Sequence, residues 1–146
     1  MNIRYANLDD LDFIYEGIID TKQCEGEKNS KIKDKHKKEF TKGIKDKSIR
    51  IAEKDKKAIG FIFFKENFSI MYEKSDFLWV QLIYVNKEFR KQGVAKDLYN
   101  DLIKISKSKN IKNICCDVFS INKGSALFHE KIGFKPKYTI YKMEIE

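Results

Sequence analysis

The stretch Ile83–Ala95 reads IYVNKEFRKQGVA, and it joins an apolar strand to a helix through a short basic loop. Its first residues are the end of a nearly continuous apolar run, FLWVQLIYV, at 77–85. A run of this length and aromatic content indicates a central strand that is buried on both faces. The stretch therefore predicts an α/β domain in which a functional loop follows a central strand.

The loop has the features of a phosphate-binding turn. Successive backbone N–H groups at a strand–helix junction form a nest for anions, and the helix dipole adds partial positive charge. Gly93 has no side chain to keep a phosphate from the backbone, and Arg90, Lys91 and Lys96 add positive charge. The Gly-Lys-Ser/Thr of a nucleoside-triphosphate loop and the three glycines of a dinucleotide fingerprint are missing. An ordinary basic connection is the alternative interpretation.

The remaining sequence alternates between strand and helix patterns. Period-two or continuous apolar runs predict strands at 2–6, 48–53, 58–65, 77–85, 114–119 and 138–145. Apolar residues spaced by three and four predict helices at 11–21, 30–42, 94–107 and 125–132. The order is β-α-α-β-β-β-α-β-α-β. One proline in 146 residues leaves little room for a linker, so we expect one domain, 1–146.

Composition excludes several classes of protein. The formal net charge is +8, but only Arg4, Arg50 and Arg90 among the 30 basic residues are Arg, the usual residue in phosphate and base forks. Nucleic-acid binding is therefore disfavoured. No apolar run approaches the ~18 residues of a membrane span, and the polar start MNIRYANLDD does not resemble a signal peptide.

The cysteines argue against a disulfide framework. There are three, an odd number, and Cys115 and Cys116 are neighbours that point to opposite faces of a strand. We interpret this pair as small core residues rather than metal ligands, and we expect no metal site. A reduced, cytoplasmic compartment fits this cysteine usage.

Residues 90–95, RKQGVA, match the Arg/Gln-x-x-Gly-x-Gly/Ala pattern of the GNAT superfamily of N-acetyltransferases. AIGF at 58–61, NKGSALFHEKIGF at 122–134 and YKM at 141–143 resemble further segments of that family, in the family's order. The resemblance covers nearly the whole chain. It implies a single-domain α/β (α+β) fold with a mixed, mostly antiparallel sheet and helices on both faces. It also implies an enzyme, an N-acetyltransferase that uses acetyl-CoA as co-substrate.

The resemblance implies which residues hold the cofactor. The backbone N–H groups of Gln92–Ala95 would bind the CoA pyrophosphate, with Arg90 and Lys91 beside it. The end of the central strand would lie along the pantetheine arm, and Asn122 and Phe128 would line the same groove. The full cofactor set is Ile83, Tyr84, Val85, Arg90, Lys91, Gln92, Gly93, Val94, Ala95, Asn122 and Phe128.

The implied reaction is direct attack of a primary amine, on a small molecule or a protein, on the acetyl thioester. The family commonly supplies an acid for the departing thiolate with a Tyr, at the position that His129 fills here. An ordinary pKa of ~6.5 would let His129 serve as that acid, and Tyr141 is a further candidate. The alternative for His129 is a packing role.

No general base stands out. Glu73, Asp76 and Asp117 are the acidic residues near the predicted acceptor side. The main rival function is a catalytically silent CoA-binding regulatory or adaptor domain, which the His129 substitution would explain. Both the acceptor amine and the formation of a homodimer remain open from the sequence.

Overall fold

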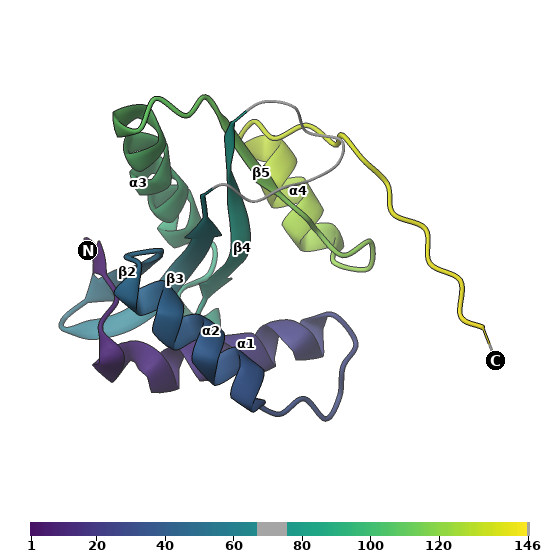
Figure 1. Ribbon diagram of the computed structural model, residues 1–146, viewed down its shortest axis with the longest axis horizontal. Coiled ribbons are helices and arrows are strands. Elements are labelled where there is room, and N and C mark those ends of the chain that lie inside the picture. Colours follow the sequence, from purple (N-terminus) through teal and green to yellow (C-terminus); the bar gives the residue numbers. More distant parts are fainter. Residues whose placement is uncertain (67–75, 146) are drawn as a thin grey trace.

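The computed structural model describes residues 1–66 and 76–145 and contains a five-stranded sheet (Figure 1). The strand order β1-β2-β3-β4-β5 follows the sequence. The first four strands pair antiparallel, and β4 and β5 pair in parallel. The strands are β1 Asn2–Tyr5, β2 Ile49–Lys54, β3 Lys57–Lys65, β4 Phe77–Val85 and β5 Asn113–Cys116.

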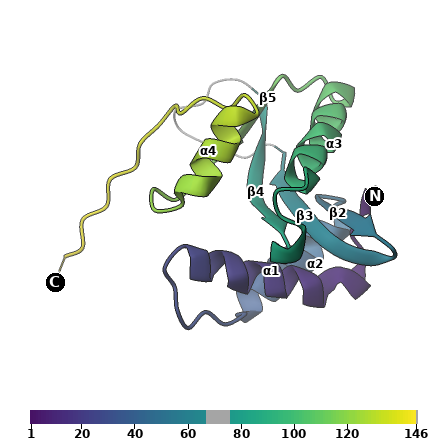
Figure 2. The same cartoon turned by 180° about the vertical axis from the view of Figure 1, so that it is seen from behind.

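Helices cover both faces of the sheet (Figures 1 and 2). On one face, α1 (Leu11–Cys24) and α2 (Asp34–Lys45) bury a cluster that includes Ile14, Phe40 and Phe61. On the other face, α3 (Val94–Ser108) and α4 (Lys123–Lys131) pack over a cluster that includes Leu98. The expected fold class, a mixed and mostly antiparallel sheet between helices, is confirmed.

Most predicted elements form close to their predicted bounds, and β4 covers the predicted 77–85. The predicted last strand, 138–145, is wrong for the single chain. This segment is extended, but it joins no strand of the described sheet. It leaves the C-terminal end of α4 and runs away from the body of the molecule (Figures 1 and 2). A strand pattern forms a strand only where a neighbouring strand supplies backbone partners.

Helix α1 lies unusually close to the sheet at Gly17. A Cβ atom at this position would lie 2.6 Å from Cε1 of Phe61 and 2.7 Å from Cδ1 of Tyr84, well inside van der Waals contact. Both rings belong to the buried cluster beneath α1. The missing side chain of Gly17 therefore sets the distance between α1 and the C-terminal half of β4.

The substitution Gly17→Ala should lower the free energy of unfolding by about 1–3 kcal/mol, the usual range for overpacking a well-packed core. Denaturant unfolding measures the change. Gly124→Ala is the matched control, because Gly124 also lies in a helix but a Cβ added there would have no atom within 4 Å. That variant should be neutral or slightly more stable, since Ala favours a helix over Gly. Equal stability of the two variants would contradict the close packing of α1 at Gly17.

Candidate active site

The two parallel strands β4 and β5 part halfway along β4. Pairing runs from Phe77 opposite Asn113 to Val80 opposite Cys116, where β5 ends. On the other side of β4, the register with β3 shifts between Val80 and Leu82, so Gln81 is an extra residue in β4. Such a bulge bends a strand and increases its twist. From Gln81 onward, the β5 side of β4 is open.

Ile83 and Val85 of β4 direct their backbone N–H and C=O groups to this open side, as the hydrogen bonds to β3 show. The N–H of Asn86 donates to the carbonyl of Ile59 in β3, at 2.9 Å. Backbone groups alternate sides along an antiparallel strand, so Tyr84 also faces β3. Ile83 and Val85 therefore turn their N–H and C=O groups toward the side that β5 has left. The side chains of both pack against the cluster beneath α3.

The side chain of Tyr84 lies on the opposite face, beneath α1. It is only 8% exposed, and its ring centroid lies 5.9 Å from that of Phe13 and 5.7 Å from that of Phe61. Burial, together with the nearby charge of Asp20, raises the pKa of Tyr84. Since its backbone groups face β3 and its side chain lies beneath α1, Tyr84 directs neither toward the open side of β4.

The loop after β4 contains two residues with left-handed backbone conformations and leads directly into a helix. A short 3-10 turn, Lys87–Phe89, is followed by Lys91 and Gly93, which both have left-handed backbone conformations, with φ of 61° and 86°. Helix α3 starts at Val94, and its first intrahelical bond runs from the N–H of Asp97 to the carbonyl of Gly93, at 3.0 Å. The N–H groups that precede Asp97 in the first turn have no acceptor within the helix, and groups of this kind can bind an anion.

The side chain of Arg90 connects the loop to β4 and to α1. Its Nε donates to the carbonyl of Val85 at 2.9 Å, and its guanidinium pairs with Asp20 on α1 at 2.7 Å. The same group lies 5.9 Å from the ring centroid of Tyr84. Asp20 was not predicted from the sequence, because it lies 70 residues before Arg90 and no local sequence pattern links the two residues. Gln92 also supports the loop, with its side-chain amide donating to the carbonyl of Glu88 at 2.9 Å.

His129 is buried between α3 and α4, with 5% of its surface exposed. Its Nδ1 lies 2.7 Å from the carbonyl oxygen of Ser125, which can only accept, so Nδ1 carries the proton. Its Nε2 lies 2.7 Å from the hydroxyl of Tyr99 and therefore accepts from it. Burial lowers the pKa of His129. Both ring nitrogens are engaged inside the protein, which favours the packing role over that of an acid.

The other predicted site residues lie on α4 and in the exposed C-terminal segment. Asn122 caps α4, since its side-chain oxygen accepts from the N–H of Ser125 at 3.1 Å. Phe128 packs against Tyr99 beneath α3. Tyr141 lies in the extended C-terminal segment and is 90% exposed, so within one chain it is not brought to the open side of β4.

Acidic residues gather where β4 and β5 part. Asp117 directly follows β5, and Glu25 follows α1. Burial raises the pKa of Glu25, and the charge of Asp117 raises it further, so the two carboxyl groups are close enough to interact. Asp76 precedes β4 and thus lies at the opposite end of that strand. Glu73 lies outside the described residues.

The cysteines behave as expected from the sequence. Cys115 and Cys116 are half-buried thiols, and burial raises the pKa of Cys116 to about 11. Among residues 1–66 and 76–145, no group of three or more His, Cys, Asp or Glu side chains could hold a metal ion.

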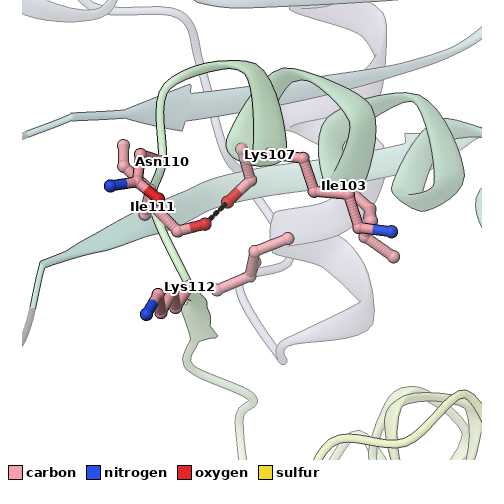
Figure 3. Close-up of a pocket in the computed structure, with 7 residues that line it drawn as sticks. Ile103, Lys107, Asn110, Ile111 and Lys112 are labelled. Atoms are coloured by element: carbon pink, nitrogen blue, oxygen red, sulfur yellow. Dashed lines mark hydrogen bonds between the residues drawn. The ribbon is translucent and has the colours of Figure 1, made fainter.

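A cavity of about 420 Å³ lies at the far end of α3, away from the Lys91–Gly93 loop (Figure 3). Its wall is largely apolar and includes Ile103, Ile111 and Ile114. The hydroxyl of Ser106, which also lines the cavity, donates to the carbonyl of Ile111 at 2.6 Å. Among the described residues that line this cavity, Lys107 and Lys112 are the charged ones, and no acidic residue accompanies them. The loop and the open side of β4 are therefore the better candidate site.

Residues 12–134 match the sequence profile of the acetyltransferase (GNAT) family. The chain belongs to this family. Membership confirms the predicted family. An uncharacterised N-acetyltransferase of Methanocaldococcus jannaschii is 27% identical over 90 residues, a stretch that covers 62% of this chain and 40% of that protein.

Solved structures share the fold over the full chain. The aminoglycoside N-acetyltransferase AAC(6')-Iy, in complex with a bisubstrate analogue of CoA and acetylneamine, has a TM-score of 0.78 at 22% identity. The alignment covers 99% of this chain and 97% of that one. An aminoglycoside 6'-N-acetyltransferase of Acinetobacter haemolyticus has a TM-score of 0.77 at 23% identity, with 100% of both chains covered. At these identities the likeness establishes the fold.

In the described part of the chain, no helix combines the length and the apolar character needed to cross a membrane.

The burial of His129 predicts a pH dependence of stability. Its pKa in the folded protein is below the ordinary value of ~6.5, so the unfolded state binds more protons as the pH falls through and below 6.5. The free energy of unfolding should therefore decrease from pH 7.5 to pH 5. Denaturant unfolding of the wild type and of His129→Gln at both pH values measures this, and the variant should lose the decrease.

His36→Gln is the control for this experiment. His36 is only partly buried, so its variant should retain most of the pH dependence. An unchanged pH dependence in His129→Gln would mean that the buried ring is not the group that titrates.

Proposed function

We propose that the chain, as one domain of residues 1–146, transfers the acetyl group of acetyl-CoA to a cationic primary amine at the open side of β4. The observation that carries the proposal is the parting of β4 from β5 directly before a loop with two left-handed residues and a helix N-terminus. This arrangement provides one place for a thioester and an adjacent place for a pyrophosphate.

The pyrophosphate would bind the N–H groups of the loop and of the first turn of α3. A helix N-terminus favours negative charge, and the position of a Cβ at Gly93 is open space. Lys91 and Lys96 are exposed beside these N–H groups and would add positive charge. The proposed cofactor residues are thus Gln92–Ala95 through their backbone, with Lys91 replacing Arg90 as the flanking charge.

The thioester would lie along the open side of β4. Attack by the amine moves the thioester π electrons onto the carbonyl oxygen, and a fixed N–H donor stabilises that oxyanion. The N–H groups of Ile83 and Val85 point to this side and are the candidate donors. The attacking nitrogen then loses a second proton to solvent, and collapse of the intermediate re-forms the carbonyl, breaks the C–S bond and expels CoA as a thiolate. With an ordinary thiol pKa of ~8.5, the thiolate gains little from a protein acid, so solvent can protonate it.

The acceptor would arrive as an alkyl ammonium and must lose a proton before it attacks. At an ordinary pKa near ~10, about one part in a thousand is neutral at pH 7. Glu25 and Asp117 would attract the cation at the point where β4 and β5 part. Burial holds the pKa of Glu25 above its usual value, which makes it a better base for this proton than an exposed carboxylate.

A cytoplasmic location belongs to the same proposal. It is supported by the odd number of cysteines and by the adjacency of Cys115 and Cys116, which do not suit a disulfide framework and fit a reducing compartment.

The loop geometry predicts an effect of Gly93→Ala on cofactor binding. A left-handed backbone costs an L-residue about 1–2 kcal/mol, and the new methyl group would enter the space of the pyrophosphate. The Kd for CoA should rise about tenfold or more, as measured by titration calorimetry. Gly133→Ala is the matched control, since Gly133 also has a positive φ, 110°, and open space around it, but lies after α4. Equal Kd values for the two variants would contradict the proposed pyrophosphate site.

Turnover distinguishes the enzyme from the silent CoA-binding domain. Purified protein is incubated with acetyl-CoA and a panel of amino sugars, polyamines, amino acids and lysine peptides, while CoA thiol release and acetylated product are measured. The proposal expects release matched by product for one class of amine, and a loss of rate in Glu25→Gln with an unchanged Kd for CoA. Tight CoA binding without any product would favour the regulatory domain.

A further inference from the structure

Two buried polar side chains lie in the otherwise apolar layer between α3 and α4. Tyr99 of α3 is 2% exposed and His129 of α4 is 5% exposed, and their ring centroids lie 5.5 Å apart. The rings of Phe128 and Phe134 pack against His129, with centroids at 5.2 and 5.3 Å. Burying polar groups in such surroundings costs free energy unless each one is hydrogen-bonded. An apolar pair would fill the same space, so what distinguishes this pair is its directional hydrogen bond.

The hydrogen bonds of the pair run in one direction. The hydroxyl of Tyr99 donates to Nε2 of His129, and Nδ1 of His129 donates to the carbonyl of Ser125, both at 2.7 Å. A hydroxyl has one proton, so Tyr99 accepts from the thiol of Cys116, its other hydrogen-bond partner. Thiol, hydroxyl, imidazole and carbonyl thus form one connected network.

This network joins three elements that border the proposed active site. Cys116 is the last residue of β5, at the point where β4 and β5 part. Tyr99 lies on α3, whose first turn is the proposed pyrophosphate site. Of the nine residues of α4, all of which the structure describes, His129 alone is buried. The hydroxyl of Tyr99 therefore holds the end of β5 and the one buried side chain of α4 against α3.

The connection between β5 and α4, residues 117–122, is held at both ends by the network. It follows Cys116 directly, and it ends at Asn122, whose side chain caps α4 by accepting from the N–H of Ser125 at 3.1 Å. It also contains Asp117, one of the two carboxylates that we place beside the acceptor amine. A shift of α4 against α3 would therefore displace this connection and the carboxylate that it carries.

We propose that Tyr99 and His129 are positioning residues for acetyl transfer, and that their buried hydrogen bond keeps residues 117–122 in place beside the open side of β4. The inference rests on the proposed function. A hydrogen bond is directional, whereas apolar burial is not, so the bond fixes the position of α4 more closely than apolar contacts would. Both residues act through the connection 117–122 rather than by touching the cofactor or the acceptor.

The double variant Tyr99→Phe/His129→Leu removes the polar pair and keeps the space filled. It should be at least as stable as the wild type in denaturant unfolding, because apolar replacement of both partners of a buried pair is often neutral or stabilising. Its kcat, measured with the best acceptor of the amine panel, should nevertheless fall about tenfold or more, since small displacements at a reacting centre are costly. The Kd for CoA should be unchanged, because the first turn of α3 does not depend on the pair.

Single variants separate positioning from packing. The side-chain amide of His129→Gln can accept from Tyr99 and donate to the carbonyl of Ser125, so this variant should keep most of kcat. His129→Leu can do neither and should be as slow as the double variant. Ser106→Ala is the control, because Ser106 is 4% exposed and bonds to the carbonyl of Ile111 at the far end of α3. Its loss should lower stability and leave kcat unchanged.

Two kinetic results would overturn the inference. One is a double variant with the kcat of the wild type, and the other is a His129→Gln variant that is as slow as His129→Leu.

Hydrogen exchange gives a readout that does not depend on turnover. The amides of residues 117–131 should exchange faster in the double variant than in the wild type, and Ser106→Ala should leave them unchanged. A wild type that acetylates no amine would overturn the proposed function, while faster exchange in the double variant would still show that the pair holds α4. Unchanged exchange at 117–131 would overturn the inference whatever the turnover.

Discussion

The structure depends on one divided strand. A strand inside a sheet is paired on both sides, and β4 is paired in this way only along its first half, over Phe77–Val80. Beyond the extra residue Gln81, it keeps β3 on one side and loses β5 on the other. The backbone groups of the second half then become available to a ligand. β4 therefore contributes side chains to the buried core along its whole length. Its second half also has backbone groups that pair with no strand on the β5 side.

Packing from both faces holds the open end in place. Beneath it, Gly17 lets α1 approach the rings of Phe61 and Tyr84. Above it, Gly60 makes room for the start of α3: a Cβ there would lie 2.9 Å from the carbonyl oxygen of Tyr84 and 3.2 Å from Cγ1 of Val94. The second half of β4 is therefore packed between two helices although it pairs with a strand on one side only. This rigidity is what a site needs if it is to present fixed N–H donors.

Local patterns in the sequence predicted the local structure well. The apolar run at 77–85, the loop at 90–95 and the start of α3 are all encoded by neighbouring residues, and each lies where the sequence placed it. Contacts between distant segments were not predictable in this way. The pairing of Arg90 with Asp20, 70 residues away, and the burial of His129 against Tyr99, 30 residues away, depend on how the helices pack. The segment 138–145 shows the converse, since its strand pattern is clear but it pairs with no strand of the described sheet.

Two bonds of Arg90 tie the cofactor loop to β4 and to α1. These bonds order the loop without a ligand. The conformational entropy of the loop is therefore lost when the protein folds and not when a ligand binds. The same ion pair connects α1, which borders the proposed acceptor side, to the loop. A substitution in α1 that displaces Asp20 would therefore also disturb the loop proposed to bind the cofactor, although Asp20 lies 70 residues before it in the sequence.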